Sequence, residues 1–201
     1  MATHKRLLKL VDSSWRKLGG AIVEVGSQRE RGKGSSYELK QLAESFGVDF
    51  FTVDLSARSY EAAKDAVGEC AFLEDGAQYL RDFKGKISIL YLDNYDIIYS
   101  QEHAKDISVR MASVAEELGY SFEDEYKQNT NSIFAHLEQA RAALPKMTNM
   151  CIIGVDDTQL RNGTWWGKGA LVVPFLTHNG FKVLAHDEKG VILGRNISVV
   201  L

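Results

Sequence analysis

The chain has 201 residues, of which 45% are hydrophobic and 25% charged, and its formal net charge is -3. This composition is typical of a soluble globular protein, and the length suits one domain with a full core. A negative net charge gives no overall attraction to nucleic acid or to an anionic membrane, and no apolar run is long enough to span a bilayer. We therefore expect a single domain over residues 1–201 that binds neither nucleic acid nor a membrane.

The two cysteines, Cys70 and Cys151, lie in or beside apolar segments and form neither a CxxC pair nor a zinc-binding pattern. Buried free thiols in a reducing compartment explain them better than a disulfide does. At the N-terminus, Lys9 and Asp12 interrupt the apolar run that a signal peptide would need. The sequence therefore predicts a cytoplasmic protein.

Strand-like and helix-like patterns alternate along the chain. The first predicted elements are, in order, a helix within residues 1–18, a strand over 21–25, a helix over 38–46, a strand over 48–55, a helix over 60–66, a strand over 70–73, a helix over 77–83 and a strand over 87–92. The later ones are a helix over 102–118, a polar surface insertion over 121–131, a helix over 132–144, a strand over 150–155, a loop over 163–169, a helix or strand over 170–177, and strands over 181–186 and 191–193. Within the segment 170–177, Pro174 argues against a central strand.

This order of elements predicts the fold class. Strands that alternate with helices form a mostly parallel sheet with helices on both faces. The last two strands are joined by a tight turn, so they must be antiparallel to each other. We expect an α/β protein with a seven-stranded, mostly parallel sheet that ends in an antiparallel hairpin.

A glycine-rich, charged loop over residues 26–36 follows the first predicted strand and leads into a helix. Strand, loop and helix in this order commonly hold a nucleotide-like ligand at the carboxyl end of the strand. The dinucleotide pattern GxGxxG is excluded because Gln28 and Arg31 stand at two of its glycine positions. The P-loop pattern fails more narrowly, because the Gly-Lys pair comes one residue late and Gly34 replaces the hydroxyl residue that would hold magnesium.

S-adenosylmethionine is the third ligand that this layout can hold. It carries no phosphate, and glycines let the backbone approach its methionine part closely. Asp54, at the end of the second predicted strand, is placed to accept both ribose hydroxyls, and Asp75, after the third, can reach the adenine edge. Each acid taken alone is also a common helix cap.

The acids Glu24, Asp54 and Asp75 occur in strand-end order together with Gly26, and the chain resembles the class I S-adenosylmethionine-dependent methyltransferases from about residue 19 to its end. The matching segments are 23–26, 34–36, 52–54, 74–77, 92–94, 180–183 and 190–193. The resemblance implies a Rossmann-like fold, and it implies these cofactor-binding residues: Glu24, Gly26, Ser27, Gly34, Ser35, Asp54, Leu55, Asp75, Gly76, Ala77 and Asp93.

The charged insert over residues 28–31 departs from the family pattern, which is usually shorter between its glycines. It leaves open which backbone groups meet the methionine carboxylate. Arg29, Arg31 and Lys33 are candidates to pair with it, although charged loop residues are more often simply solvated.

Aspartates follow two neighbouring predicted strands: Asp93 ends one, and Asp156 and Asp157 end the next. The carboxyl ends of parallel strands meet at one edge of the sheet, where three carboxylates repel one another unless they are protonated or bind a cation. The set resembles the ligands of metal-dependent O-methyltransferases of the catechol and macrocin types, which implies Mg2+. Such an ion would bind a substrate hydroxyl and lower its pKa. Ordinary strand-end capping is the alternative.

Candidate catalytic residues are Asp93, Asp96 and His136, and His103 is a weaker candidate for the general base. Candidate substrate residues are Tyr95, Trp165, Trp166 and Lys168. The indole rings can stack on an aromatic or sugar face, and Lys168 can pair with an anionic group. Residues 119–135 and 159–169 are the predicted substrate loops.

The predicted function is methyl transfer from S-adenosylmethionine to a hydroxyl of a small-molecule acceptor, with assistance from a divalent metal as an option. Two other functions stay open: a non-catalytic binding module of the same fold, and a nucleotide-dependent enzyme with a degenerate P-loop. A homodimer is compatible with the sequence, which does not decide the oligomeric state.

Overall fold

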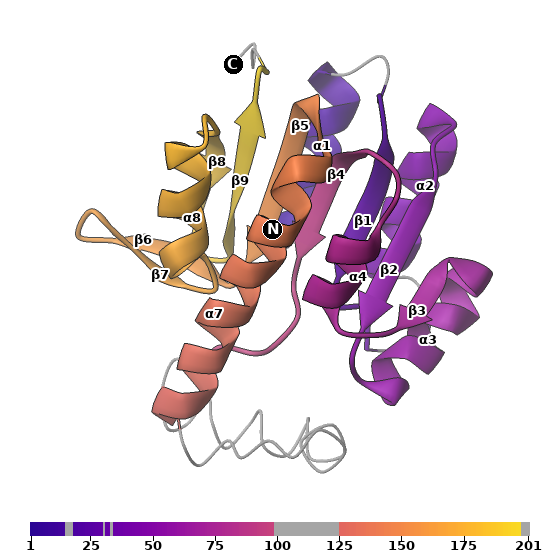
Figure 1. Cartoon of the computed structure of the whole chain (residues 1–201), viewed down its shortest axis with the longest axis horizontal. Coiled ribbons are helices and arrows are strands. Elements are labelled where there is room, and N and C mark those ends of the chain that lie inside the picture. The colour runs from indigo at the N-terminus through magenta and orange to yellow at the C-terminus, as the bar shows by residue number, and fades with distance from the viewer. Residues whose placement is uncertain (15–17, 30, 33, 99–124, 198–201) are drawn as a thin grey trace.

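The predicted alternation of strands and helices folds into a seven-stranded sheet in the order β3-β2-β1-β4-β5-β9-β8 (Figure 1). The computed structural model describes residues 1–14, 18–29, 31–32, 34–98 and 125–197. The five strands from β3 to β5 are parallel, β9 is antiparallel to β5, and β8 is antiparallel to β9. The predicted fold class is therefore confirmed, including the closing antiparallel hairpin.

The strands of this sheet are β1 (Ala21–Val25), β2 (Phe50–Asp54), β3 (Ala71–Leu73), β4 (Ile87–Leu92), β5 (Met147–Asp156), β8 (Lys182–His186) and β9 (Gly190–Arg195). A separate two-stranded hairpin consists of β6 (Thr158–Arg161) and β7 (Thr164–Gly167). The helices are α1 (Thr3–Ser14), α2 (Ser35–Phe46), α3 (Ala57–Val67), α4 (Gly76–Asp82), α7 (Glu125–Ala143) and α8 (Gly169–His178), with short 3-10 turns at Gly68–Cys70 and Leu144–Lys146.

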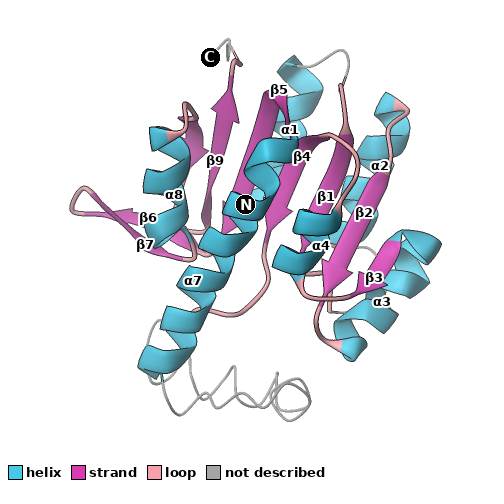
Figure 2. Cartoon of the chain, viewed as in Figure 1, coloured by secondary structure: helices cyan, strands magenta, loops and turns pink. Residues whose placement is uncertain are grey.

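Helices cover both faces of the sheet and create two apolar cores (Figure 2). On one face, α4, α7 and α8 bury residues such as Leu80, Ala140 and Val172 against the sheet. On the other face, α1, α2 and α3 bury residues such as Leu7 and Leu39. Because strands β1 and β4 lie between these layers, all of their residues are buried, as expected for parallel strands covered on both sides.

The strand order reverses between β1 and β4, and this reversal places the candidate site. From β1 the chain continues to β2 and β3 on one side, and then returns to β4 and β5 on the other. The connections on the two sides diverge at the carboxyl ends of β1 and β4, which leaves a crevice where α/β sheets usually bind ligands. The glycine-rich loop and the strand-end aspartates all belong to this edge.

The structure corrects two sequence-based predictions and decides between the two alternatives for a third segment. Residues 125–131 belong to helix α7 and not to an irregular insertion, and the predicted loop over 163–169 contains strand β7 of the β6–β7 hairpin. The segment 170–177, for which the sequence allows a helix or a strand, is helical with Pro174 inside α8, in agreement with the argument against a central strand. Helix α8 buries Val172 and Val173 completely against the sheet.

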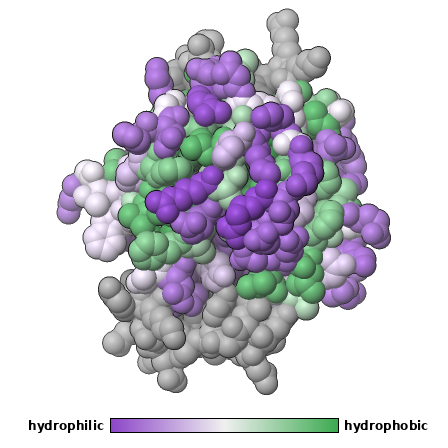
Figure 3. All heavy atoms as spheres, in the orientation of Figure 1, coloured by the Kyte–Doolittle hydropathy of each residue, from purple (hydrophilic) through white to green (hydrophobic). Residues whose placement is uncertain are grey.

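Several predictions lie outside the described residues, namely the helix over 102–118, His103, Lys33 and the first part of the predicted substrate loop 119–135. In the part of the chain that the structure describes, no helix is both long enough and apolar enough to cross a membrane. The face formed by α4, α7 and α8 carries mainly hydrophilic side chains at its centre, with apolar side chains gathered towards α8 (Figure 3).

Candidate functional site

The loop after β1 packs directly against the end of β4. Gly26 has a φ of +92°, and a Cβ atom built on it would lie 2.2 Å from the backbone nitrogen of Asn94. Glycine is therefore required here both for its conformation and for the close approach of the two backbones. This contact holds the first loop beside Asp93, so Gly26 lies at the predicted cofactor site.

Glu24 forms the centre of a buried polar cluster behind this loop. Its side chain is fully buried, and Oε2 accepts hydrogen bonds from Ser36 Oγ at 2.5 Å and from Thr52 Oγ1 at 2.7 Å. Ser27 Oγ in turn lies 2.8 Å from Thr52 Oγ1. Burial raises the pKa of Glu24 to about 7, although the hydroxyl donors oppose the rise. The cluster ties the first loop to β2 and to the first turn of α2.

Gln28 holds the charged insert together, a role that the sequence did not suggest. Its side chain is buried, its Nε2 donates to the carbonyl of Gly32 at 2.8 Å, and its Oε1 accepts from the backbone N–H of Tyr37 at 3.3 Å. Its own backbone N–H donates to Ser36 Oγ at 3.0 Å. The amide side chain of Gln28 thus bonds to Gly32 and to the first turn of α2, and it holds the conformation of the insert. In the sequence, the feature that could have indicated this role is that Gln28 is uncharged and directly precedes the charged residues 29–31.

Asp54 links the first two strand ends. Its Oδ2 accepts from the backbone N–H of Ser27 and its Oδ1 from that of Ser56, both at 2.8 Å. Burial raises its pKa to about 6, against the opposing effect of these two backbone donors and of Arg29. Because a carboxylate oxygen accepts more than one hydrogen bond, Asp54 retains acceptor capacity at the end of β2.

Asp75 is the N-cap of helix α4, and its Oδ1 accepts from the backbone N–H of Gln78 at 2.8 Å. Its side chain is exposed, whereas the neighbouring Gly76 and Ala77 are buried. The capping role was the alternative interpretation of this residue, and it uses Oδ1. Leu55, next to Asp54, is 42% exposed.

A cavity of about 420 Å3 opens between the first loop and the ends of β4 and β5. This size is within the range of small-molecule sites. Its described lining residues are Ser27, Gln28, Arg29, Arg31, Gly34, Ser35, Asp93, Asp96, Asp156 and Asp157. The structure therefore brings together most of the predicted residues from the first loop, β4 and β5.

The two arginines of the insert differ in how they face this cavity. Arg29 pairs with Asp96 across it, with 3.1 Å between Nη1 and Oδ1. Arg31 pairs with Asp65 of α3 and its side chain is 80% exposed. Of the described candidates for the methionine carboxylate, Arg29 is therefore the one that pairs with another lining residue of the cavity and is less exposed.

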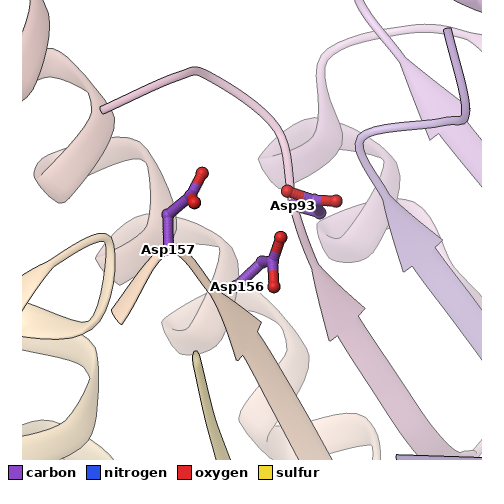
Figure 4. Close-up of side chains that lie close together, drawn as sticks. All are labelled: Asp93, Asp156 and Asp157. Carbon is purple, nitrogen blue, oxygen red and sulfur yellow. The ribbon is translucent and has the colours of Figure 1, made fainter. Parts of the chain in front are cut away.

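The carboxylates of Asp93, Asp156 and Asp157 point towards a common space at the ends of β4 and β5 (Figure 4). One oxygen from each lies within 4.8 Å of the others. Burial, together with repulsion from the other two carboxylates, raises the pKa of Asp156 to about 8 against the effect of Lys168. The three acids therefore converge as the sequence predicts.

Two residues at this edge have left-handed backbone conformations that side chains other than glycine rarely adopt. Tyr95 has a φ of +53° and Asp157 a φ of +43°. Such strain is found preferentially where a functional site requires a particular side-chain placement. Both residues follow strand ends, one after β4 and one after β5.

Lys168 reaches into the acidic cluster from the end of the β6–β7 hairpin. Its side chain is fully buried, and Nζ lies 2.8 Å from Asp93 Oδ1 and 3.0 Å from Asp157 Oδ2. Burial alone would lower the pKa of Lys168, but Asp157, Asp93 and Asp156 outweigh it, so the pKa lies above its ordinary value. The residue was predicted to bind substrate, and these two carboxylates are its partners in the structure.

Lys168 contacts the same carboxylates that are predicted to bind Mg2+. Three carboxylates supply the hard oxygen ligands that Mg2+ prefers. The ammonium of Lys168, however, already bridges two of the three. The donor set therefore does not fit a divalent ion as long as Lys168 keeps its place, and the metal stays a prediction.

Three other candidates lie elsewhere. His136 is fully buried in α7, its Nδ1 lies 2.6 Å from the carbonyl oxygen of Ser132, and burial and the charge of Lys168 lower its pKa to about 3. Trp165 packs partly buried against the sheet and edge-on to His186. Trp166 is 55% exposed, with Arg161 over its ring. None of these belongs to the described lining of the cavity.

No protein-family model matches the sequence, and no curated protein is significantly similar to it. Solved structures with the same fold are found at low identity. The O-methyltransferase NovP is 12% identical with a TM-score of 0.56, over 96% of this chain and 77% of that chain. A candidate rRNA-methylase from Clostridium thermocellum is 9% identical with a TM-score of 0.53, over 97% of each chain.

The structure of NSun6 from Pyrococcus horikoshii with SFG is 13% identical with a TM-score of 0.55, over 96% of this chain. This chain spans about half the length of some of these structures: 49% of NSun6 and 48% of TrmN from Thermus thermophilus. At such identities the likeness shows the fold, which is that of class I S-adenosylmethionine-dependent methyltransferases. The named structures include both an O-methyltransferase and a candidate rRNA-methylase, so the substrate class does not follow from them.

Proposed function

We propose that this protein transfers a methyl group from S-adenosylmethionine to a hydroxyl of a small-molecule acceptor. The observation that carries the proposal is the cavity at the reversal of strand order, lined jointly by the first loop and by the aspartates after β4 and β5. The fold of the similar structures supports the choice of cofactor, and the acidic wall supports a small acceptor over a nucleic acid.

The residues of the site suit the parts of S-adenosylmethionine. We assign the ribose hydroxyls to Asp54, the adenine edge to Asp75, and the methionine carboxylate to Arg29. The aspartates of the cavity suit the positive charges of the sulfonium and the amino group. When bound, S-adenosylmethionine supplies a methyl group on a positively charged sulfur, which leaves as a neutral thioether.

The chain itself would position the acceptor and take up its proton. An oxygen of the acceptor must lie in line with the bond that breaks, so most of the rate enhancement would come from orientation. Asp96 uses Oδ1 for its pair with Arg29, and we assign the hydroxyl proton to its Oδ2. Asp93, on the same wall, is the second candidate. Both carboxylates line the cavity, whereas His136 does not face it.

Calorimetric titration with S-adenosylhomocysteine tests the cofactor assignment. The wild-type chain is expected to bind saturably, and Asp54→Asn is expected to bind about tenfold or more weakly, because a hydrogen bond to a charged acceptor is lost. Asp49→Asn is the matched control, since Asp49 is exposed at the opposite end of β2. No binding to the wild-type chain at millimolar ligand would sink the proposal.

Ligand-binding and activity measurements also distinguish two alternative functions. Cofactor binding without methyl transfer to any member of a panel of hydroxylated compounds would favour a binding module of the same fold. Magnesium-dependent binding of ATP in preference to S-adenosylhomocysteine would favour a nucleotide-dependent enzyme with a degenerate P-loop.

A further inference from the structure

We propose that the ammonium group of Lys168 is the resident cation of the Asp93–Asp156–Asp157 cluster, in the place of a divalent metal. Methyl transfer by this chain then proceeds without a metal ion. The second statement rests on the proposed function, whereas the first concerns the apo protein and can be tested alone.

The geometry of the cluster is that of an occupied cation site. The ammonium lies within hydrogen-bonding distance of one oxygen of Asp93 and one of Asp157. The oxygens that could otherwise share a metal lie within 4.8 Å of one another. An ion coordinated by all three carboxylates would therefore compete with Nζ for the same oxygens and the same space.

The backbone around Lys168 is built to hold it there. Strand β7 pairs with β6 so that Gly167 lies opposite Thr158, the residue after Asp157. The hairpin therefore returns the chain to the end of β5, where the backbone N–H of Lys168 donates to the carbonyl of Asp157 at 3.1 Å. Gly167 has a φ of +78°, and a Cβ on it would lie 2.0 Å from that same carbonyl oxygen.

Displacing the lysine would be unfavourable. Lys168 is fully buried, and an ammonium group removed from its two carboxylates would either remain buried without a partner or force the hairpin to open. Lysine offers three donors on a single positive charge, which suits a set of several carboxylate oxygens. Within this site Lys168 is a positioning residue: it holds Asp93 and Asp157 on the cavity wall, where the acceptor would bind.

Binding of Mn2+ to the apo protein tests the inference, with the free ion measured by its electron paramagnetic resonance signal. The wild-type chain is expected to show no saturable binding at the cluster. Lys168→Met, which keeps an unbranched side chain one atom shorter and removes its charge, is expected to bind Mn2+ saturably, with an affinity roughly tenfold or more above any weak binding to the wild-type chain. Adding Asp156→Asn to Lys168→Met should abolish that gain.

Lys182→Met is the matched control, because Lys182 is exposed on β8, and it should behave as the wild-type chain does. Saturable Mn2+ binding to the wild-type chain that Asp156→Asn removes would overturn the inference, as would a folded Lys168→Met variant that gains no affinity. Circular dichroism establishes whether that variant is folded.

If Lys168→Met does not fold, nitrogen-15 spectra of the lysine ammonium groups of the wild-type chain give the answer. A buried, ion-paired ammonium should give a resonance that Lys182 does not share and that millimolar Mg2+ leaves unchanged, whereas a shift on adding Mg2+ would overturn the inference. S-adenosylhomocysteine binding in excess chelator is measured separately, so a failure of the proposed function is distinguished from a failure of this inference.

Discussion

At the residue scale, the most informative group is Glu24, because this fully buried carboxyl accepts its hydrogen bonds from the hydroxyl groups of Ser36 and Thr52. Burial raises its pKa from 4.5 to about 7, which corresponds to about 3 kcal/mol against ionisation in the folded protein. Between these two pH values the folded state holds more protons than the unfolded state. Its contribution to stability is therefore fully present below pH 4.5 and is lost as the pH rises towards 7 and above.

Glu24→Gln should remove this pH dependence, because glutamine stays neutral and can still accept hydrogen bonds from Ser36 and Thr52. As the pH rises from 4.5 to 8, the free energy of unfolding of the variant should increase by about 2–3 kcal/mol relative to that of the wild-type chain. Urea unfolding across this pH range measures it. Glu61→Gln, on the exposed surface of α3, is the control, and identical slopes for all three proteins would contradict the assignment.

At the scale of elements, the two adjacent tryptophans of the β6–β7 hairpin lie in different environments. Trp165 contacts His186 of β8 edge-on, with ring centroids 5.5 Å apart, and packs against the core next to the sheet. Trp166 points to solvent on the opposite side of the strand, as successive residues of a strand do. The hairpin also carries Lys168 to the acidic cluster, so its attachment matters to the site.

Trp165→Ala should therefore lower the free energy of unfolding by about 1–3 kcal/mol, less than for a fully buried tryptophan. Trp166→Ala is its matched control and should change stability by about 0.5 kcal/mol at most. Denaturant unfolding followed by circular dichroism measures both. Equal effects of the two substitutions would show that the hairpin is not anchored through Trp165.

At the scale of the whole molecule, one sheet separates two apolar cores, and among the described helices none contributes to both. Leu80 belongs to the core under α4 and Leu39 to the core under α2, and both are fully buried. Because strands β1 and β4 contribute side chains to both cores, neither core can unfold while the other keeps a complete sheet.

Leu80→Ala and Leu39→Ala should each lower the free energy of unfolding by about 2–5 kcal/mol. Both should shift the midpoint of one common transition without changing its dependence on denaturant. Leu73→Ala, at a position that is 51% exposed, should have little effect. Two separate transitions in either core variant would show that the faces unfold independently.

The sequence by itself determined the sheet and its ligand edge. The alternation of apolar runs and amphipathic segments is a local property, and strand-end residues such as Asp54, Asp93 and Asp156 come to the same edge in any parallel sheet. The convergence of the three aspartates therefore followed from the chain order alone. The same local reasoning failed at residues 125–131, which belong to helix α7 and not to a polar surface insertion.

Only the tertiary structure decided what meets these aspartates. Lys168 lies 75 residues from Asp93 in the chain, and its entry into the cluster depends on the length and pairing of the β6–β7 hairpin, which a sequence pattern does not encode. Its sequence context predicted that Lys168 pairs with an anionic group of a substrate. Its complete burial between carboxylates became visible only once distant segments were packed together, because the electrostatics of a buried charge depend on distances in space and not along the chain.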